Sequence, residues 1–263
     1  YKATLTNSFI KEFILGGVKS LSKACAIPLF LTPVFFTSLV NAEPYPDSST
    51  APIKIADGND YIIEDGGSVD LTGQTESWIT NTNGKFEGNW DNVNFSTSSD
   101  KIISTVNTTV ENNETEEKVK TIINLNRESG ENELSNTSSE NTVVGIYNNK
   151  AITEITSNGT LTISSKRSSD SGTSTESLVS AIYNVNKFEK ISSSDSLLNI
   201  DIEGNLDISA SDAFGNLTAY GIRSELENLE LSSTYDKNIS TEINAKDIFI
   251  TTSSKSGIKD IGI

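Results

Sequence analysis

The sequence contains no histidine, and it has only one cysteine and five prolines among 263 residues. Imidazole is needed for Ser-His-Asp and Cys-His hydrolysis, for general-base catalysis by histidine and for His-ligated zinc, so its absence excludes these sites from this chain. Aromatic residues make up 7% and hydrophobic residues 35% of the sequence. That is lean for a compact globule of this length but above the range of most disordered chains, and it suits an elongated fold with a thin core.

Basic residues are scarce too, with 20 lysines and arginines against 36 aspartates and glutamates, a formal net charge of −16. Four of the lysines and one of the glutamates lie between Tyr1 and Ala42, so the rest of the chain keeps 16 basic and 35 acidic residues, a net charge of −19. Such a surface repels phosphate backbones, and no basic stripe with interleaved aromatic residues occurs. We therefore expect no nucleic-acid partner.

The single cysteine, Cys25, lies near the N-terminus, and no cysteine follows it. The chain after Ala42 therefore cannot close a disulfide within itself. A covalent loop would obstruct a chain that passes unfolded through a narrow pore, so the absence fits secretion through a pore. A lipoprotein site at Cys25 is disfavoured because the apolar run follows the cysteine instead of preceding it.

The stretch from Tyr1 to Ala42 has the three parts of a secretory signal. A basic region is followed by the apolar run Ala24–Leu39, which two prolines interrupt, and then by Val40 and Ala42 at positions −3 and −1. This order predicts a mostly helical signal peptide over residues 1–42, with cleavage after Ala42. A transmembrane anchor is the alternative, but a span needs about 18 to 20 apolar residues and this run is shorter.

The long, semi-apolar basic region carries a family resemblance. The stretch KATLTNSFIKEFILGGVKSLSKACAIPLF, with the later Asn41-Ala42, resembles the extended signal peptides of autotransporters, the type V secreted proteins. The resemblance ends at Ala42. It implies a right-handed parallel β-helix as the exported passenger, the secretion machinery and a C-terminal outer-membrane β-barrel beyond Ile263 as partners, and a location on or outside the surface of a Gram-negative cell, reached through the periplasm.

We expect a linker over residues 43–60, because Glu43–Pro52 holds three of the five prolines together with Asp and Ser. Regular structure is expected from Tyr61, where Tyr61–Leu71 predicts a strand, a Gly66-Gly67 turn and a second strand.

From there, short apolar alternations separated by polar clusters predict an all-β fold. The clearest expected strands are Thr121–Leu125, Thr160–Ser164, Leu198–Ile202, Leu206–Ile208 and Ile248–Ile250.

Two motifs recur in alternation. One is Gly or Ala before an isoleucine, at Ile146, Ile182, Ile222 and Ile258, in sequence steps of 36, 40 and 36. The other has Leu161, Leu206 and Ile248 at equivalent places, in steps of 45 and 42. An elastic period near 40 predicts stacked coils with variable loops, so residues 61–263 are expected to be a repetitive β solenoid that continues past Ile263. A globular β-sandwich is the alternative.

The stretch Asn107–Glu140 has many acidic and amide residues and few apolar ones. It is expected to be a long loop, or weakly paired early coils. Small residues before the repeated isoleucines favour stacking, because Gly or Ala suits a corner where neighbouring coils pass close by.

Three groups could suggest chemistry, and each has a plainer interpretation. Asp170-Ser171-Gly172 resembles the nucleophile sequence of serine-protease passengers, but a triad would need a histidine. Asp201, Glu203 and Asp207 could pair as in polysaccharide-cleaving enzymes or calcium sites, or they could be the wet side of an amphipathic strand. Asp57–Asp60 lacks the spacing of known calcium loops.

Asn-x-Ser/Thr sequons begin at Asn107, Asn158, Asn216 and Asn238, and their number is what chance gives in so polar a chain. We predict no catalytic, cofactor-binding or metal-binding residue here.

The expected function is that of a structural stalk or adhesin, not an enzyme, with a host or neighbouring-cell surface as its partner. A β-helix enzyme acting on polysaccharide, with clustered acids beside Arg or Lys, and an anchored surface-layer protein are the alternatives.

Overall fold

The computed structural model describes residues 42–45, 52–108, 119–126, 130–168, 178–188, 195–213, 218–228, 239–254 and 260–261. All regular structure in these ranges is β, and they contain no helix. The expected signal peptide lies outside them except for Ala42.

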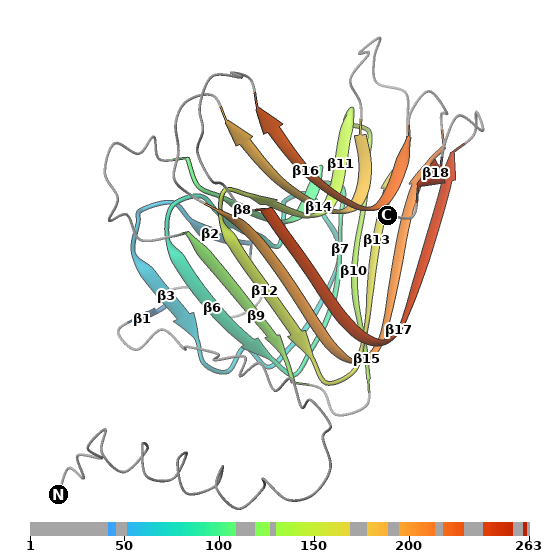
Figure 1. Cartoon of the computed structure of the whole chain (residues 1–263). Helices are drawn as coiled ribbons and strands as arrows, with labels where there is room; N and C mark the ends of the chain where they lie inside the picture. The colour runs from blue at the N-terminus through green and yellow to red at the C-terminus, as the bar shows by residue number, and fades with distance from the viewer. Residues whose placement is uncertain are drawn as a thin grey trace, which may run out of the picture. The chain divides into compact units, whose positions relative to one another are not determined.

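The chain winds through three faces in turn, and one such turn is called a coil. Each described pairing joins a strand in parallel to the strand on the same face of the preceding or following coil (Figure 1). The first face contains β1 (Glu43–Pro44), β3 (Asp60–Ile63), β6 (Lys85–Trp90), β9 (Lys120–Leu125) and β12 (Ile152–Ser157). The second contains β4 (Ser68–Gln74), β7 (Asn92–Thr97), β10 (Glu131–Ser138) and β13 (Thr160–Arg167). The third contains β2 (Ile53–Ile55), β5 (Ile79–Asn81), β8 (Lys101–Val106), β11 (Thr142–Asn149), β14 (Leu178–Phe188), β16 (Ala219–Asn228) and β18 (Asp260–Ile261).

Two long strands join the first face to the second. β15 (Ser196–Asp212) and β17 (Ile239–Ser254) each bend and run along both faces, with a register shift between Ile202 and Asn205 at the corner. The expectation of an all-β chain of parallel stacked passes is thereby confirmed, and the arrangement is consistent with a parallel β-helix.

The isoleucine repeat is a physical ladder on the third face. Ile146, Ile182 and Ile222 lie directly opposite one another. The ladder also extends toward the N-terminus through Ile103, Ile79 and Ile53. Ile258, the last member of the expected series, lies outside the described residues.

The expected period near 40 does not hold for the first coils. The two earliest steps of the ladder, from Ile53 to Ile79 and from Ile79 to Ile103, are much shorter than the three steps that lead from Ile103 to Ile222. A coil can therefore close with far fewer residues than the visible repeats suggest, and the longer steps hold extra residues in the connections that enter and leave the third face. The short steps precede Ile146, where the repeated motif begins, so the motif does not mark the first coils.

The second track is confirmed on the second face, where Leu161, Leu206 and Ile248 are in register. The first face has a ladder of its own, which the sequence motifs did not reveal: Ile123, Ile155, Ile200 and Ile243. Alternation explains all three ladders, since every second side chain points inward; Leu198, Ile200 and Ile202 are between 0 and 2% exposed.

Aromatic side chains fill the interior of the first two coils. Trp78, Phe86, Trp90 and Phe95 are all at most 1% exposed, and the ring centroids of Trp78 and Trp90 are 4.8 Å apart. Gly88 makes room for this packing, because a Cβ there would lie 2.1 Å from the Trp90 ring. Later coils replace these rings with Ile, Leu and small polar residues.

The stretch Asn107–Glu140 is not a long loop where the structure describes it, because it contains β9 and β10, both paired on two sides. The polar composition misleads because Asn132 and Asn136 point inward and are 0 and 1% exposed. Asn132 Oδ1 accepts a hydrogen bond from Val93 N (2.9 Å), and Asn136 Nδ2 donates to Val144 O (3.1 Å). Buried amides that bond to the backbone of neighbouring strands look like loop residues in the sequence.

Paired structure begins before Tyr61, since β1 and β2 lie within residues 43–60, where a linker is expected. The strand, turn and strand over Tyr61–Leu71 match β3 and β4, but they do not form a hairpin. β3 pairs with β1 and β6, and β4 pairs with β7. The Gly66-Gly67 turn is a corner between two faces.

A row of buried polar side chains lines the corner between the third and first faces. Its buried members, opposite one another in successive coils, are Asn81, Thr105, Asn148 and Asn184, and the exposed Ser224 continues the row on β16. Each asparagine binds the turn that follows it or the coil beyond: Asn81 Nδ2 donates to Gly84 O (2.9 Å), and Asn148 Nδ2 donates to Ala151 O (3.0 Å). This row, here called the amide ladder, satisfies backbone groups at a corner where strand pairing stops.

Candidate functional site

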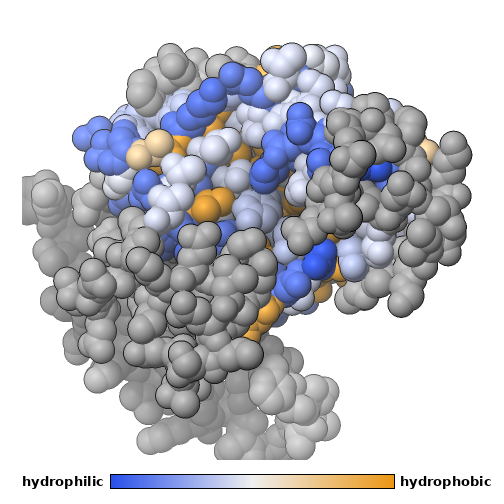
Figure 2. Space-filling model, turned by 90° about the horizontal axis from the view of Figure 1, so that it is seen from above, coloured by the Kyte–Doolittle hydropathy of each residue, from blue (hydrophilic) through white to orange (hydrophobic). Residues whose placement is uncertain are grey.

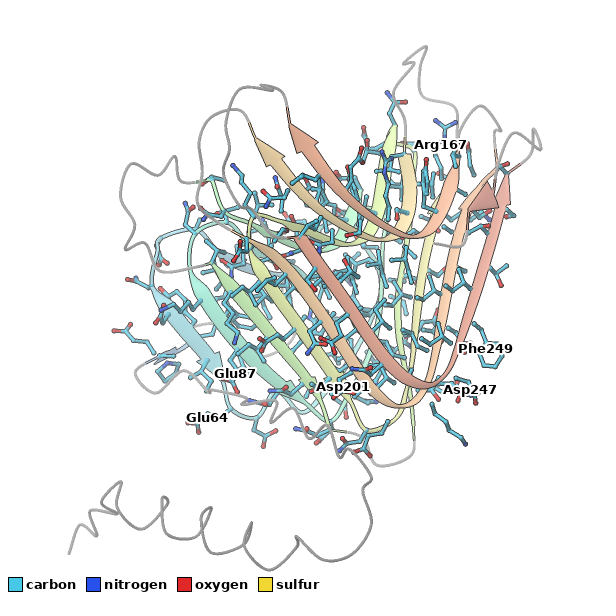
Figure 3. The ribbon with its side chains drawn as sticks, viewed as in Figure 1. Glu64, Glu87, Arg167, Asp201, Asp247 and Phe249 are labelled. Carbon is cyan, nitrogen blue, oxygen red and sulfur yellow. The ribbon has the colours of Figure 1, made fainter. Side chains whose placement is uncertain are left out.

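The acids that the sequence singles out do not form a cluster with charged partners. Asp201 lies opposite Thr156 and Asn244, and Asp207 opposite Thr162 and Phe249. Glu203 is exposed at the bend of β15. Asp201, Asp247 and Phe249 lie on the outside of the coils (Figure 3). Asp201, Glu203 and Asp207 thus lie on the solvent-facing side of an amphipathic strand, as the plainer interpretation predicts.

The Asp57–Asp60 segment is closed by its own hydrogen bonds. Asp57 Oδ2 accepts from Tyr61 Oη at 2.6 Å and from Asn59 Nδ2 at 3.2 Å, and its Oδ1 accepts from Asn59 N at 3.1 Å. These donors, the tyrosine hydroxyl foremost, lower the pKa of Asp57 below 3.8. The same contact, made to a carboxylate, raises the pKa of Tyr61 above 10.0. The carboxylate therefore serves the turn that leads into β3.

Of the remaining candidates, Asp170-Ser171-Gly172 and the sequons at Asn216 and Asn238 lie outside the described residues. Asn107 is only 3% exposed, and its backbone N–H donates to Asn149 O at 3.0 Å, so it cannot carry a glycan in this fold. Asn158 is exposed at the corner between β12 and β13.

A buried ion pair lies at the end of the second face. Arg167 and Asp212 are opposite one another in β13 and β15, with Nε and Oδ1 3.1 Å apart and side chains 2% and 0% exposed. Ser138 and Ser254 continue this row on either side. The Arg167–Asp212 pair thus forms a buried charged contact between two adjacent coils, and a serine lies on either side of it in the row.

The outer surface of the third face carries aromatic and charged side chains together. We call this group the outer tyrosine cluster; it comprises Lys101, Tyr147, Tyr183, Tyr220, Arg223 and Glu225. The Tyr147 and Tyr183 rings, from adjacent coils, have centroids 5.7 Å apart. Seen from the side of β14 and β16, the described surface mixes hydrophilic and hydrophobic residues (Figure 2).

Cations cover the rings of this cluster. Lys101 Nζ lies 5.5 Å from the Tyr147 centroid, and Arg223 Cζ lies 5.2 Å from Tyr183 and 4.8 Å from Tyr220. Tyr183 Oη donates to Glu225 Oε2 at 3.1 Å, and Arg223 forms an ion pair with the same carboxylate. Burial first, and then the Glu225 charge, raises the pKa of Tyr183 well above 10.0. The contacts within the cluster stabilise the stacking of successive coils.

Sequence reasoning did not single out this cluster, although its signal was present. Tyr147, Tyr183 and Arg223 each follow the repeated isoleucine, so the motif itself marks the column. The alternation that turns the isoleucine inward turns the next residue outward.

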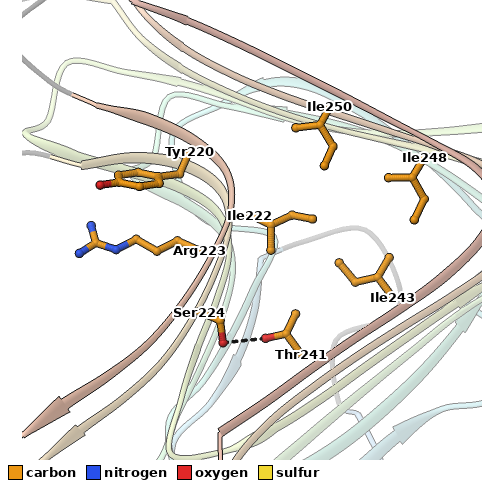
Figure 4. A pocket seen from close by; sticks show the side chains of 8 residues that line it. All are labelled: Tyr220, Ile222, Arg223, Ser224, Thr241, Ile243, Ile248 and Ile250. Atoms are coloured by element: carbon orange, nitrogen blue, oxygen red, sulfur yellow. Dashed lines mark hydrogen bonds between the residues drawn. The ribbon is translucent and has the colours of Figure 1, made fainter. Parts of the chain in front are cut away.

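A hollow of about 670 Å³ lies between β16 and β17, at the last described coil (Figure 4). Ile222, Ile243, Ile248 and Ile250 line its apolar part, and Thr241 Oγ1 donates to Ser224 Oγ at 3.0 Å on its polar side. Ile248 is 44% exposed. These are the inward positions of the ladders, so among the described residues the hollow belongs to the interior of the last coil and is not a separate ligand pocket.

No group of three acidic, histidine or cysteine side chains that could hold a metal ion occurs in the described ranges. Within the same ranges, no helix is long and apolar enough to cross a membrane. The clusters of side chains described above are held by packing, by hydrogen bonds between coils and by ion pairs.

Comparisons of the chain with protein-family models, with curated proteins and with solved structures find no match.

Proposed function

We propose that this chain is the exported N-terminal part of an autotransporter-type surface protein, in which residues 1–42 are a cleaved signal peptide and the coils form a stalk or adhesin without catalysis. The observation that carries the proposal is the in-register parallel stacking of successive coils around a filled interior. Such a stack suits an elongated support, since each added coil lengthens it without a new kind of contact.

The same proposal includes a right-handed β-helix. Parallel strands of one sheet joined by a crossover are connected with a right-handed sense in about 98% of cases. Every coil here returns to the same face by way of two others, which is a crossover of that kind. The cysteine-free chain after Ala42 and the leader pattern support export through the periplasm to the cell surface, where another cell would be the partner.

Expression of the full chain in a Gram-negative host tests the export step. We expect a periplasmic product that begins at Glu43, identified by N-terminal sequencing. The matched control is Ala42→Lys, which places a large charged side chain at position −1 and should leave the leader attached. A wild-type product that stays in the cytoplasm with its leader intact would contradict the proposal, and release of reducing ends from polysaccharides by the purified product would contradict the absence of catalysis.

A further inference from the structure

The segment directly after the expected cleavage bond is built into the fold. Glu43 and Pro44 form β1 and lie opposite Tyr61 and Ile62 of β3. Tyr45 N then donates to Ile62 O at 2.9 Å. The residues that would begin the exported protein are therefore the end strand of the first face. A flexible tail would make none of these contacts.

Tyr45 crosses the end of the stack and closes it. Its ring meets Tyr61 edge-on, at a centroid distance of 5.7 Å, and Phe86 at 6.3 Å. Its hydroxyl accepts a hydrogen bond from Lys54 N (3.0 Å), which belongs to β2 on the third face. One side chain thus ties the first face to the third over the buried aromatic interior.

The two ends of the described stack differ. At the far end, β17 offers a 16-residue edge with Ile248 and Phe249 44% and 53% exposed. At the near end, β1 has two residues, one of them a proline, and β2 has three. Short strands with proline are a common protection of sheet edges against pairing with other chains. We call Ala42–Tyr45 the strap, because it holds this end shut.

We propose that the strap serves twice: first as the segment that carries the cleavage bond to the leader peptidase, and then as the closure of the N-terminal end, in which the backbone beside that bond is held in a strand pair with β3 while the Glu43 and Pro44 side chains stay exposed. The inference rests on the proposed export function. Hydrolysis adds one water across the Ala42–Glu43 amide, leaving a carboxylate on Ala42 and an amino group on Glu43. Proteases commonly bind their substrates as extended strands, but the backbone beside this bond is already paired with β3. Cleavage therefore precedes closure, and the docked strap protects an unprocessed chain from the peptidase.

Cleavage of the folded precursor tests this order. The full chain is refolded, checked by the fluorescence of the buried Trp78 and Trp90, and incubated with purified signal peptidase in detergent micelles. Wild type, Tyr45→Ala and Tyr45→Phe are compared, with Tyr220→Ala as the matched loss of a tyrosine at the other end. We expect folded wild type and Tyr220→Ala to be cut at least about tenfold more slowly than Tyr45→Ala, because cleavage follows the population of the open strap. Tyr45→Phe, which loses only the bond to Lys54 N, should be intermediate.

The same chains, added to the peptidase directly from denaturant, separate the two proposals. Rapid cleavage after Ala42 in this arm with slow cleavage of the folded form supports the strap. Equal rates in both arms overturn the strap and leave the leader assignment standing. Absence of cleavage even from denaturant overturns the leader assignment, and the strap proposal with it. If Tyr45→Ala fails to fold, the comparison of Tyr45→Phe with wild type still decides the question.

Discussion

Arg167 is the largest charged side chain in the interior of this stack, where it meets Asp212 of the next coil. Removing charges from water is expensive, so such a pair contributes little net stability when intact, yet breaking it leaves a buried charge. A shift of register by two residues would place Arg167 opposite Ala210 instead of Asp212 and leave a buried charge unpaired. At the scale of the residue, the pair selects one alignment of β13 and β15.

Asp212→Asn should lower the free energy of unfolding by about 3 kcal/mol, because the guanidinium keeps its burial and loses its counter-charge. Urea unfolding followed by circular dichroism measures the change. The double variant Arg167→Met, Asp212→Leu removes both charges and should recover most of the loss. A single variant as stable as wild type would show that the pair is not buried as described.

Tyr183 should ionise at a pH well above the ordinary range of a tyrosine. Burial and the Glu225 carboxylate raise its pKa in the folded state above the ordinary value of 10.0. Its contribution to stability is therefore complete below pH 10 and is lost as the pH rises through the folded pKa, since the unfolded chain releases the proton first. Absorbance titration of phenolate should show a contribution at high pH that Tyr183→Phe removes. A high-pH part of the titration that is unchanged in Tyr183→Phe would contradict this environment.

At the scale of the element, the corners hold the coils in place as much as the strands do. Asn148 Nδ2 donates to Asn184 Oδ1 of the next coil at 2.9 Å, and Thr153 Oγ1 donates to Asn148 Oδ1 at 2.9 Å. Gly145 precedes the inward Ile146, and a Cβ there would lie 2.5 Å from Ala181 O. The small residue and the amide thus mark two places along one strand, β11, where neighbouring coils approach closely.

Asn148→Ala should destabilise the fold by about 2–3 kcal/mol, because buried groups of two coils lose their partners. Asn124→Ala is the matched control: Asn124 also bonds across coils, donating to Asn89 Oδ1 at 2.8 Å, but it faces outward and water can replace it. Its loss should be below about 1 kcal/mol. Equal effects in urea unfolding would show that the amide ladder is no more than a surface row.

At the scale of the molecule, stability should be graded along the stack. The first two coils bury four large aromatic side chains beneath the strap, whereas β17 has one described partner strand, β15, and exposed Ile248 and Phe249. In a repeat architecture each coil depends on its neighbours, so the less covered end opens first.

A dye on Ser253→Cys should therefore respond at lower urea than a dye on Thr137→Cys, in a chain with Cys25→Ser. Thr137 is the matched site, because it lies outward in β10 in the same column as Ser253, three coils earlier. Tryptophan fluorescence, which reports Trp78 and Trp90 in the first coils, should change at the highest urea. Three coincident transitions would mean that the whole stack unfolds as one unit.

The class of fold could be predicted from local patterns alone. Alternation with period two and the recurrence of Ile146, Ile182 and Ile222 predict inward ladders without knowledge of the partners. The same alternation placed the acids of β15 on the solvent side. The lack of histidine and of a later cysteine excluded several kinds of site before any geometry was known.

Which coil lies against which became clear only in the folded chain. The ladder of the first face, the short first coils and the inward Asn132 and Asn136 were not visible in the sequence. A buried amide and an exposed one are the same letter, and they differ only in the partners that folding brings to them, Val93 N for Asn132 and Asp100 O for Asn136. Likewise, Tyr45 follows a proline and resembles linker until Lys54, Tyr61 and Phe86 are brought around it. The direction of a side chain follows from the alternation of its own strand. The hydrogen-bond partners of a buried amide, and the closure of the N-terminal end by Tyr45, depend on residues that only folding brings close.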